Sequence, residues 1–427
     1  MFMLESEMIS RRSLLALASI ASGASLAQPR PSEDIYLVQG VTFIGTPNQQ
    51  LSAAPYILEL NRDEGFRKAM ENRIRLAAAS LRIKSGHRIQ ENLASVQGDT
   101  YALSFAVTGE RVEVERVGGA QFNIQYRLRV LVLVMNMSVK PENRKIVSVY
   151  NVPVTYLTLG DRPPSKSQRL EMFRRLYLDP PAGADAISAW LKVASSLELR
   201  EGNVWVKIAP FTLNPKASRM MTEAGIGAPE IAQMSRRFTS DAEDGISGRF
   251  NIPVIPSVSG DAVESAIVFT FNDSSLALQI FGSTNSAGKE ELFAFPEPSW
   301  IIEMSAKDYR YARSKQMSPG GNPVDIIDVA LAIELNVRPA SPSHPIPPLQ
   351  TTFFKRENKA FIDPSRIVES SADTNRLSER LMIEIIDFMA NPASGDSWLK
   401  VAHIFPERTA SIKSLMQRIS QQFSTRR

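Results

Sequence analysis

Three histidines are the only imidazole groups in the chain, and they lie far apart in the sequence. His87 follows a helix-like segment, His344 lies in a Pro-rich stretch, and His403 comes shortly after a tryptophan. The chain has no cysteine, which excludes thiolate nucleophiles, disulfides and Cys-ligated metals. The H-E-x-x-H zinc motif, the G-x-S-x-G elbow, the P-loop and the G-x-G-x-x-G fingerprint do not occur. We therefore predict no catalytic residue, no metal ligand and no cofactor.

Two short segments come near to known chemical patterns. Tyr311 and Lys315 have the Tyr-x-x-x-Lys spacing of short-chain dehydrogenases, but the dinucleotide fingerprint that accompanies that pair does not occur. The acidic run 241–245 is similar to the start of a calcium loop, yet its glycine comes one place early and no late glutamate follows. We interpret the first as a basic polar loop and the second as an acidic turn within a mobile surface loop at 241–248.

Carboxylates leave one catalytic class open. The chain has 45 Asp and Glu residues. Two of them at about 5 to 9.5 Å suffice to hydrolyse a glycosidic bond, and distance along the sequence cannot reveal such a pair. A carboxylate-based periplasmic hydrolase acting on envelope polysaccharide is therefore the alternative hypothesis.

The segments that must position these groups follow a regular order in the N-terminal half. Residues 35–44 alternate like a strand, and 63–83 have the apolar spacing of an amphipathic helix. Four strand-like runs follow, at 101–107, 111–117, 122–139 and 146–159. The segment 108–110 is short enough for a hairpin, and Pro153 favours a place at the sheet edge for the last run. Two helices are expected next, at 168–178 and 185–197.

The C-terminal half repeats this order. We expect a strand at 204–213, a helix at 229–238, strands at 264–272, 275–281, 300–305, 324–337 and 349–354, and a helix at 377–389. The sequence therefore predicts an α+β fold made of two diverged copies of a β-α-β-β-β-β-α module with mainly antiparallel sheets, whose helices cover one face of each sheet. The modules should occupy 28–200 and 201–427, and they should pack against each other or share a strand because only 198–203 joins them.

One pentapeptide, Trp-Leu-Lys-Val-Ala, occurs twice, beginning at Trp190 and at Trp398. The chain has only four tryptophans, and each copy follows an apolar-periodic segment and a Pro/Gly turn, so duplication explains the match better than chance. The leucine and valine that follow each tryptophan have the spacing of a helix face directed at a core. We predict that Trp190 and Trp398 are equivalent core residues, and not surface residues that stack on a sugar or grip a partner.

The N-terminus has the layout of an export signal. Arg11 and Arg12 precede a short apolar run, and a small-residue stretch ends at Ala27. This order predicts a signal peptide at 1–27, cleaved between Ala27 and Gln28, and the paired arginines favour the twin-arginine route. The apolar run is far shorter than the roughly 20 residues that span a bilayer. We expect a soluble mature protein in the periplasm or outside the cell.

The net charge and the C-terminal segment limit the kinds of partner that the protein can bind. A net charge of +4 over 427 residues is too mild for the concentrated basic face of a nucleic-acid-binding protein. The segment 410–423 is amphipathic and basic, so it is interpreted as a helix that caps the second module or as a peripheral contact with an anionic membrane. No transmembrane span is expected after the signal peptide.

These features favour an exported, non-enzymatic, two-module binding or assembly protein of the bacterial periplasm or cell envelope. The order of helices and strands is similar, as a pattern, to the small α+β modules of periplasmic envelope-assembly and secretion proteins. Such a protein would take another protein or an envelope component as its partner.

Overall fold

The computed structural model of the protein describes residues 35–43, 51–81, 88–90, 100–118, 121–136, 145–197, 204–257, 268–269, 295–317, 320–321, 323–361 and 370–424. The predicted signal peptide, with Arg11, Arg12, Ala27 and Gln28, lies outside the described residues. His87, the linker 198–203 and most of the strands expected at 264–281 also lie outside them.

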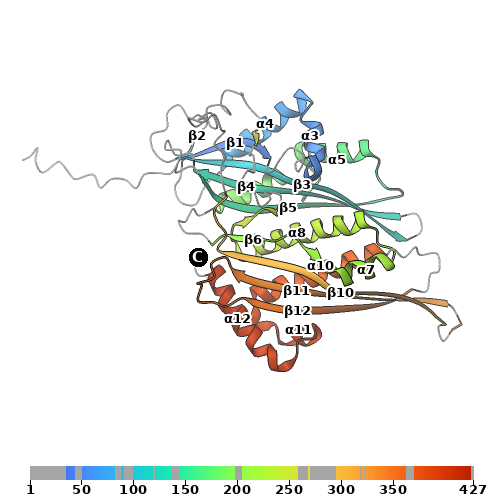
Figure 1. The fold of residues 1–427 in the computed structure, drawn as a ribbon. Coiled ribbons are helices and arrows are strands. Elements are labelled where there is room, and N and C mark those ends of the chain that lie inside the picture. The colour runs from blue at the N-terminus through green and yellow to red at the C-terminus, as the bar shows by residue number, and fades with distance from the viewer. Residues whose placement is uncertain are drawn as a thin grey trace, which may run out of the picture.

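The first sheet is built from the N-terminal half, apart from one short strand of the C-terminal half, and it is mainly antiparallel (Figure 1). Strand β1 (Ile35–Phe43) runs parallel to β3 (Thr100–Gly118), and β4 (Gln121–Asn136) and β5 (Lys145–Gly160) follow as an antiparallel meander. Two short strands pair with β1, namely β2 (Arg88–Gln90) and β9 (Val268–Phe269). Strand β5 is the last of its sheet, which confirms the edge position predicted from Pro153.

The second sheet has the same central plan. Strand β6 (Val206–Ile208) runs parallel to β10 (Trp300–Met317), and β11 (Pro323–Pro339) and β12 (Leu349–Phe361) complete an antiparallel meander. The strand expected at 204–213 is split in two, because Pro210 interrupts it and has no N–H to donate. The remaining short strands are β7 (Thr212–Leu213), beside β10, and β8 (Val254–Ile255), beside β6.

Helices pack on both sheets and between them. The first half contributes α3 (Pro55–Leu60), α4 (Glu64–Ser80), α5 (Lys166–Leu178) and α6 (Ala186–Ser195). The second half contributes α7 (Pro215–Glu223), α8 (Ala228–Phe250), α10 (Ser370–Ala390), the 3₁₀ turn η4 (Pro392–Ser394), α11 (Asp396–Val401) and α12 (Pro406–Ser424). The α+β fold with mainly antiparallel sheets is thus confirmed. Figure 1 shows α8 and α10 between the two sheets.

One predicted hairpin is absent from the described part of the chain. Residues 108–110 do not turn, because β3 continues through them as one strand of 19 residues. A shift of register between Val107 and Gly109 marks a bulge there, and both runs of β3 pair with the single long strand β4. The meander of the first half therefore has three strands, since a bulge can absorb a glycine that reads as a turn.

The acidic run 241–245 was predicted as a surface loop, and this prediction is wrong. The run is helical and lies inside α8. Gly245 serves the packing of this helix, because a Cβ at this position would come 2.6 Å from Ile386 Cδ1 of α10. The expected loop around Tyr311 and Lys315 is likewise a strand, β10.

The first sheet is buried on both faces, whereas helices were predicted on one. One face, which we call the inner face, packs on α3, α4, α5 and α6. Sheet residues such as Leu103 and Val130 share a core there with helix residues such as Trp190. The other face contributes Leu131, with Leu133 and Met135, to a small core that includes Trp205 and Ile255 of the second half. Burial on both faces explains the unbroken apolar run of β4. The two halves are therefore packed together, as expected.

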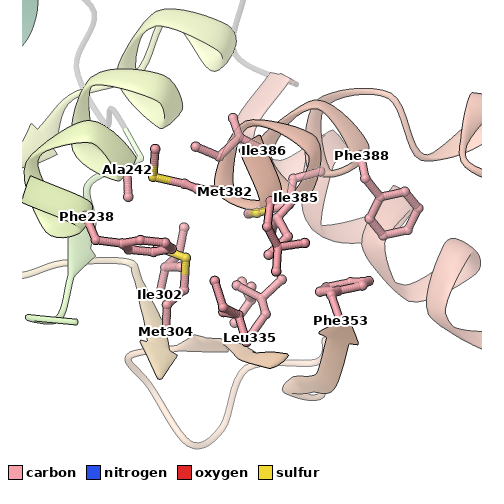
Figure 2. Close-up of a cluster of buried hydrophobic side chains, with 14 of the residues drawn as sticks. Phe238, Ala242, Ile302, Met304, Leu335, Phe353, Met382, Ile385, Ile386 and Phe388 are labelled. Carbon is pink, nitrogen blue, oxygen red and sulfur yellow. The ribbon is translucent and has the colours of Figure 1, made fainter. Parts of the chain in front are cut away.

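The second core lies between the second sheet and its helices. Figure 2 shows Phe238 of α8 and Ile385 of α10 directed toward strand residues such as Leu335, while Met382 of α10 lies beside Ala242 of α8. Helix α12 adds a buried apolar stripe to this core: Ile412, Met416, Ile419 and Phe423. The predicted capping role of this helix thus accounts for the stripe. Among the described helices, none has the length and apolar character needed to cross a bilayer.

Candidate functional site

Arginines from the first sheet meet acids from α8 where the two halves pack together. Arg127 of β4 places Nη1 3.0 Å from Asp241 Oδ1 and Nη2 3.0 Å from Glu379 Oε1 of α10. Arg111 of β3 places Nη2 3.3 Å from the same Asp241 oxygen. Arg237 of α8 extends the network, with Nη2 2.8 Å from Glu379 Oε2. We call this set of charges, together with Arg129 and its partners Glu243 and Asp244, the ion network.

Arg129 is the most buried cation of the ion network, with 9% of its surface exposed. Its Nη1 lies 2.5 Å from Glu243 Oε2, and its Nε lies 2.6 Å from Asp244 Oδ1. Burial disfavours the charge of Arg129, but the two carboxylates outweigh it and raise its pKa. Burial also raises the pKa of Asp244 to about 6, against the lowering effect of Arg129. Both groups are therefore charged at neutral pH.

A cleft of about 600 Å³ lies beside the ion network and is lined by both halves. Its walls include Tyr56 from α3, Leu128 from β4 and Phe211 from the second half. Arginines dominate its charged lining: Arg111, Arg127, Arg129, Arg169, Arg236 and Arg237. The acids that line it are Glu110, Asp241 and Asp244. The cleft therefore carries more positive than negative charge.

Two of these arginines are not part of the ion network. Arg169 of α5 is half-buried and donates from Nε to Pro164 O at 3.0 Å. Arg236 of α8 is exposed. Neither forms an ion pair with a carboxylate of the described residues. One guanidinium from each half thus lines the same cleft without a described carboxylate partner.

Glu110 is a buried carboxyl at the bulge of β3. It accepts hydrogen bonds from Tyr56 N at 2.6 Å, from Ile57 N at 3.0 Å and from Tyr177 Oη at 2.8 Å. Tyr56 and Ile57 stand in the first turn of α3, so Glu110 satisfies amides that have no partner within the helix. Burial raises the pKa of Glu110 to about 7, against the lowering effect of these hydrogen bonds. The carboxyl thus fixes the start of α3.

Glu110 and Asp244 both line the cleft and have raised pKa values, but they do not face each other. Glu110 is held by α3 and α5, which pack on the inner face of the first sheet. Asp244 is held by Arg129 on the opposite face, where α8 lies (Figure 1). A facing carboxylate pair suited to glycoside hydrolysis is therefore not formed by these two acids.

The structure places the two repeated tryptophans in different surroundings. Trp190 of α6 is fully buried, and its Nε1 donates to Ser104 O of β3 at 3.2 Å. Trp398 of α11 is half-buried, and its Nε1 donates to Glu384 Oε2 at 3.0 Å. Each packs on a phenylalanine of its own half, Phe105 and Phe353 respectively. Both therefore pack against a core, but with unlike hydrogen-bond partners.

The described histidines lie apart from the cleft. His344 packs edge-on against Trp300, and His403 packs edge-on against Phe354. Among the residues with described positions, no three His, Asp or Glu side chains converge in a way that could hold a metal ion.

The ion network and the cleft were missed at the sequence level. One signal was present: Arg127 and Arg129 interrupt an apolar strand at alternate positions, so both point to one face. The matching signal was the acidic run of α8, with Asp241 and Asp244 on neighbouring turns. Joining the two signals needs the tertiary structure, because Arg127 and Asp241 are 114 positions apart.

A scan against protein-family models finds no model that matches this chain, and a search of curated proteins finds no match.

Proposed function

We propose that the protein is an exported binding or assembly component of the bacterial periplasm or cell envelope, and that the cleft between its halves is the binding surface. The leader sequence with Arg11, Arg12 and the Ala27–Gln28 junction supports export. The observation that carries the binding role is the cleft itself. It is concave, partly apolar and lined by both halves, as ligand sites between domains commonly are.

We also propose that the halves are diverged copies of one module. In each half a first strand lies parallel to the first strand of a three-stranded meander, and helices separate the two in sequence. Each meander is followed by a long helix and then by the helix with the repeated pentapeptide, which begins at Trp190 or Trp398. The common plan is β-α-α-β-β-β-α-α. The two tryptophans have different hydrogen-bond partners, and we attribute this difference to divergence of the two copies after the duplication.

The alternative is a carboxylate-based hydrolase of envelope polysaccharide. Two carboxyls with raised pKa values, Glu110 and Asp244, line one cleft, and such groups gather at active sites. The contacts of these two carboxyls indicate structural roles, because Glu110 accepts hydrogen bonds from the start of α3 and Asp244 pairs with Arg129. The binding role is therefore the better supported of the two.

Site-specific photocrosslinking in the periplasm tests the binding role. A photoreactive phenylalanine at Gln233, which is exposed and lines the cleft, should yield a discrete adduct in the native host. The matched control is the same group at Gln417, an exposed glutamine of α12, which should yield none.

The opposite pattern would count against the proposal. Adducts at Gln417 and not at Gln233 would move the binding surface away from the cleft. Release of sugar from isolated envelope polysaccharide by the purified protein, abolished by Glu110→Gln, would make the hydrolase the correct assignment.

A further inference from the structure

We propose that the cleft binds a small amphipathic anion, that is, a carboxylate or phosphate head group on an apolar body. This inference rests on the proposed binding role of the cleft and adds the chemistry of its ligand. Three observations carry it: unpaired guanidinium groups, a buried donor without an acceptor, and an apolar wall.

The unpaired guanidinium groups supply the attraction. Arg111, Arg127 and Arg237 are neutralised by acids of the ion network. Arg169 and Arg236 line the cleft without a described carboxylate partner. Guanidinium groups bind carboxylate and phosphate with paired, charge-assisted hydrogen bonds. An anion in the cleft would have one such group from each half of the protein.

The buried donor is Nη2 of Arg129. Arg129 lines the cleft, and its Nη1 and Nε are used by Glu243 and Asp244. Its Nη2 is buried and has no hydrogen-bond partner. A buried donor without an acceptor is unfavourable, because it has lost its hydrogen bonds to water. An oxygen of a ligand head group would supply the missing acceptor, so the cleft favours an acceptor-rich group beside Arg129.

The apolar wall limits the kind of anion. Apolar residues that keep accessible surface, Tyr56, Pro153 and Pro210, line the same cleft as the arginines. Its volume of about 600 Å³ lies within the roughly 300 to 1,000 Å³ of sites for small ligands. Polyanions such as nucleic acids are bound by basic charge spread over a face or a stripe, whereas here the arginines line one hollow. The occupant is therefore a small molecule with an apolar portion.

Titration calorimetry of the full mature chain tests this inference with four probes at low salt, below the concentrations at which they form micelles. Decyl phosphate and decanoate carry the two head groups, decanol lacks the charge, and inorganic phosphate lacks the apolar body. At least one of the two charged amphiphiles should bind with one-to-one stoichiometry, and the tighter one identifies the head group. Decanol and inorganic phosphate should bind at least about tenfold more weakly.

Variants locate the site. The double change Arg169→Ala and Arg236→Ala should weaken the charged amphiphile by about tenfold or more, and it spares the ion network. Arg418→Ala on α12, which removes an exposed arginine away from the cleft, is the matched control and should leave affinity unchanged. Arg129→Lys keeps the charge but removes Nη2, and it should also weaken binding.

Four results would overturn the inference. Decanol binding as tightly as decanoate and decyl phosphate would remove the role of the charge. Inorganic phosphate binding as tightly as decyl phosphate would leave a simple anion site. No loss of affinity in the double variant would place the ligand elsewhere. A crosslinked partner at Gln233 without any amphiphile binding would refute this inference while the binding role of the cleft stands.

Discussion

The buried carboxyl of Glu110 is expected to make folding stability fall as the pH rises through the weakly acidic range. Its pKa is raised from 4.5 to about 7 by burial. Between these values the folded chain keeps a proton that the unfolded chain has already released. Because the folded state then binds more protons, raising the pH favours unfolding. A shift of this size corresponds to about 3 kcal/mol, since each pKa unit is worth about 1.4 kcal/mol.

The substitution Glu110→Gln isolates this effect. Glutamine has the same length, and its Oε1 can still accept from Tyr56 N or Ile57 N. Urea unfolding of both proteins at several values from about pH 4.5 to about pH 8 gives two free-energy curves, and in their difference the other titrating groups cancel. Between the lowest and the highest pH, the unfolding free energy of the variant should rise by about 3 kcal/mol relative to that of the wild type.

A second variant checks the assignment of the proton. Tyr177→Phe removes the phenol that donates to Glu110, and that hydrogen bond lowers the pKa of the carboxyl. The stability of this variant should therefore continue to fall up to a higher pH than that of the wild type. A free-energy difference between wild type and Glu110→Gln that stays flat with pH would refute the reasoning, because Glu110 would then titrate alike in both states.

Further outcomes are expected from export, core packing and the ion network. Mass spectrometry of the protein from its native host should show Gln28 at the amino terminus, and an uncut chain would contradict this. Trp190→Ala should cost about 3 to 5 kcal/mol of unfolding free energy, and Trp398→Ala clearly less because that side chain is half-buried; equal losses would argue against this ranking. Arg129→Met should cost about 3 to 5 kcal/mol by leaving Glu243 buried and unpaired, and adding Glu243→Gln should restore part of it; no recovery would mean that the loss comes from packing. Elemental analysis should find no stoichiometric zinc, iron or copper, since the chain has no cysteine and few histidines.

Features of the fold that depend on residues close together in the sequence could be predicted from the sequence. The apolar stripe of α12, with Ile412, Met416 and Phe423, repeats at the spacing of one helix face and is buried as a capping helix would be. The position of Pro153 in an edge strand follows from its missing N–H. In both cases the physical cause lies within a few residues of the signal.

The candidate site could not be predicted in this way. A run such as 241–245 looks alike whether water or arginines surround its carboxylates, and only the partner decides between a loop and a buried helix. Here the partners are Arg127 and Arg129, which lie more than 100 positions earlier in the chain. The hairpin error has a similar origin, because Gly109 permits a turn and a bulge equally well, and the long partner strand β4 selects the bulge.

The interface between the two halves has an apolar part and an ionic part. Salt should strengthen the apolar part and weaken the ionic part. The apolar part is the apolar cluster around Trp205 and Ile255, and excluded salts such as sulfate strengthen burial of this kind. The ionic part is the ion network, in which Glu379 is far more exposed than Glu243. Screening acts first on exposed pairs, so rising ionic strength should loosen the Arg127–Glu379 contact before the Arg129–Glu243 contact. The two halves would then separate at the ion network while the apolar cluster stays in contact. The cleft, which lies beside the ion network, would become wider.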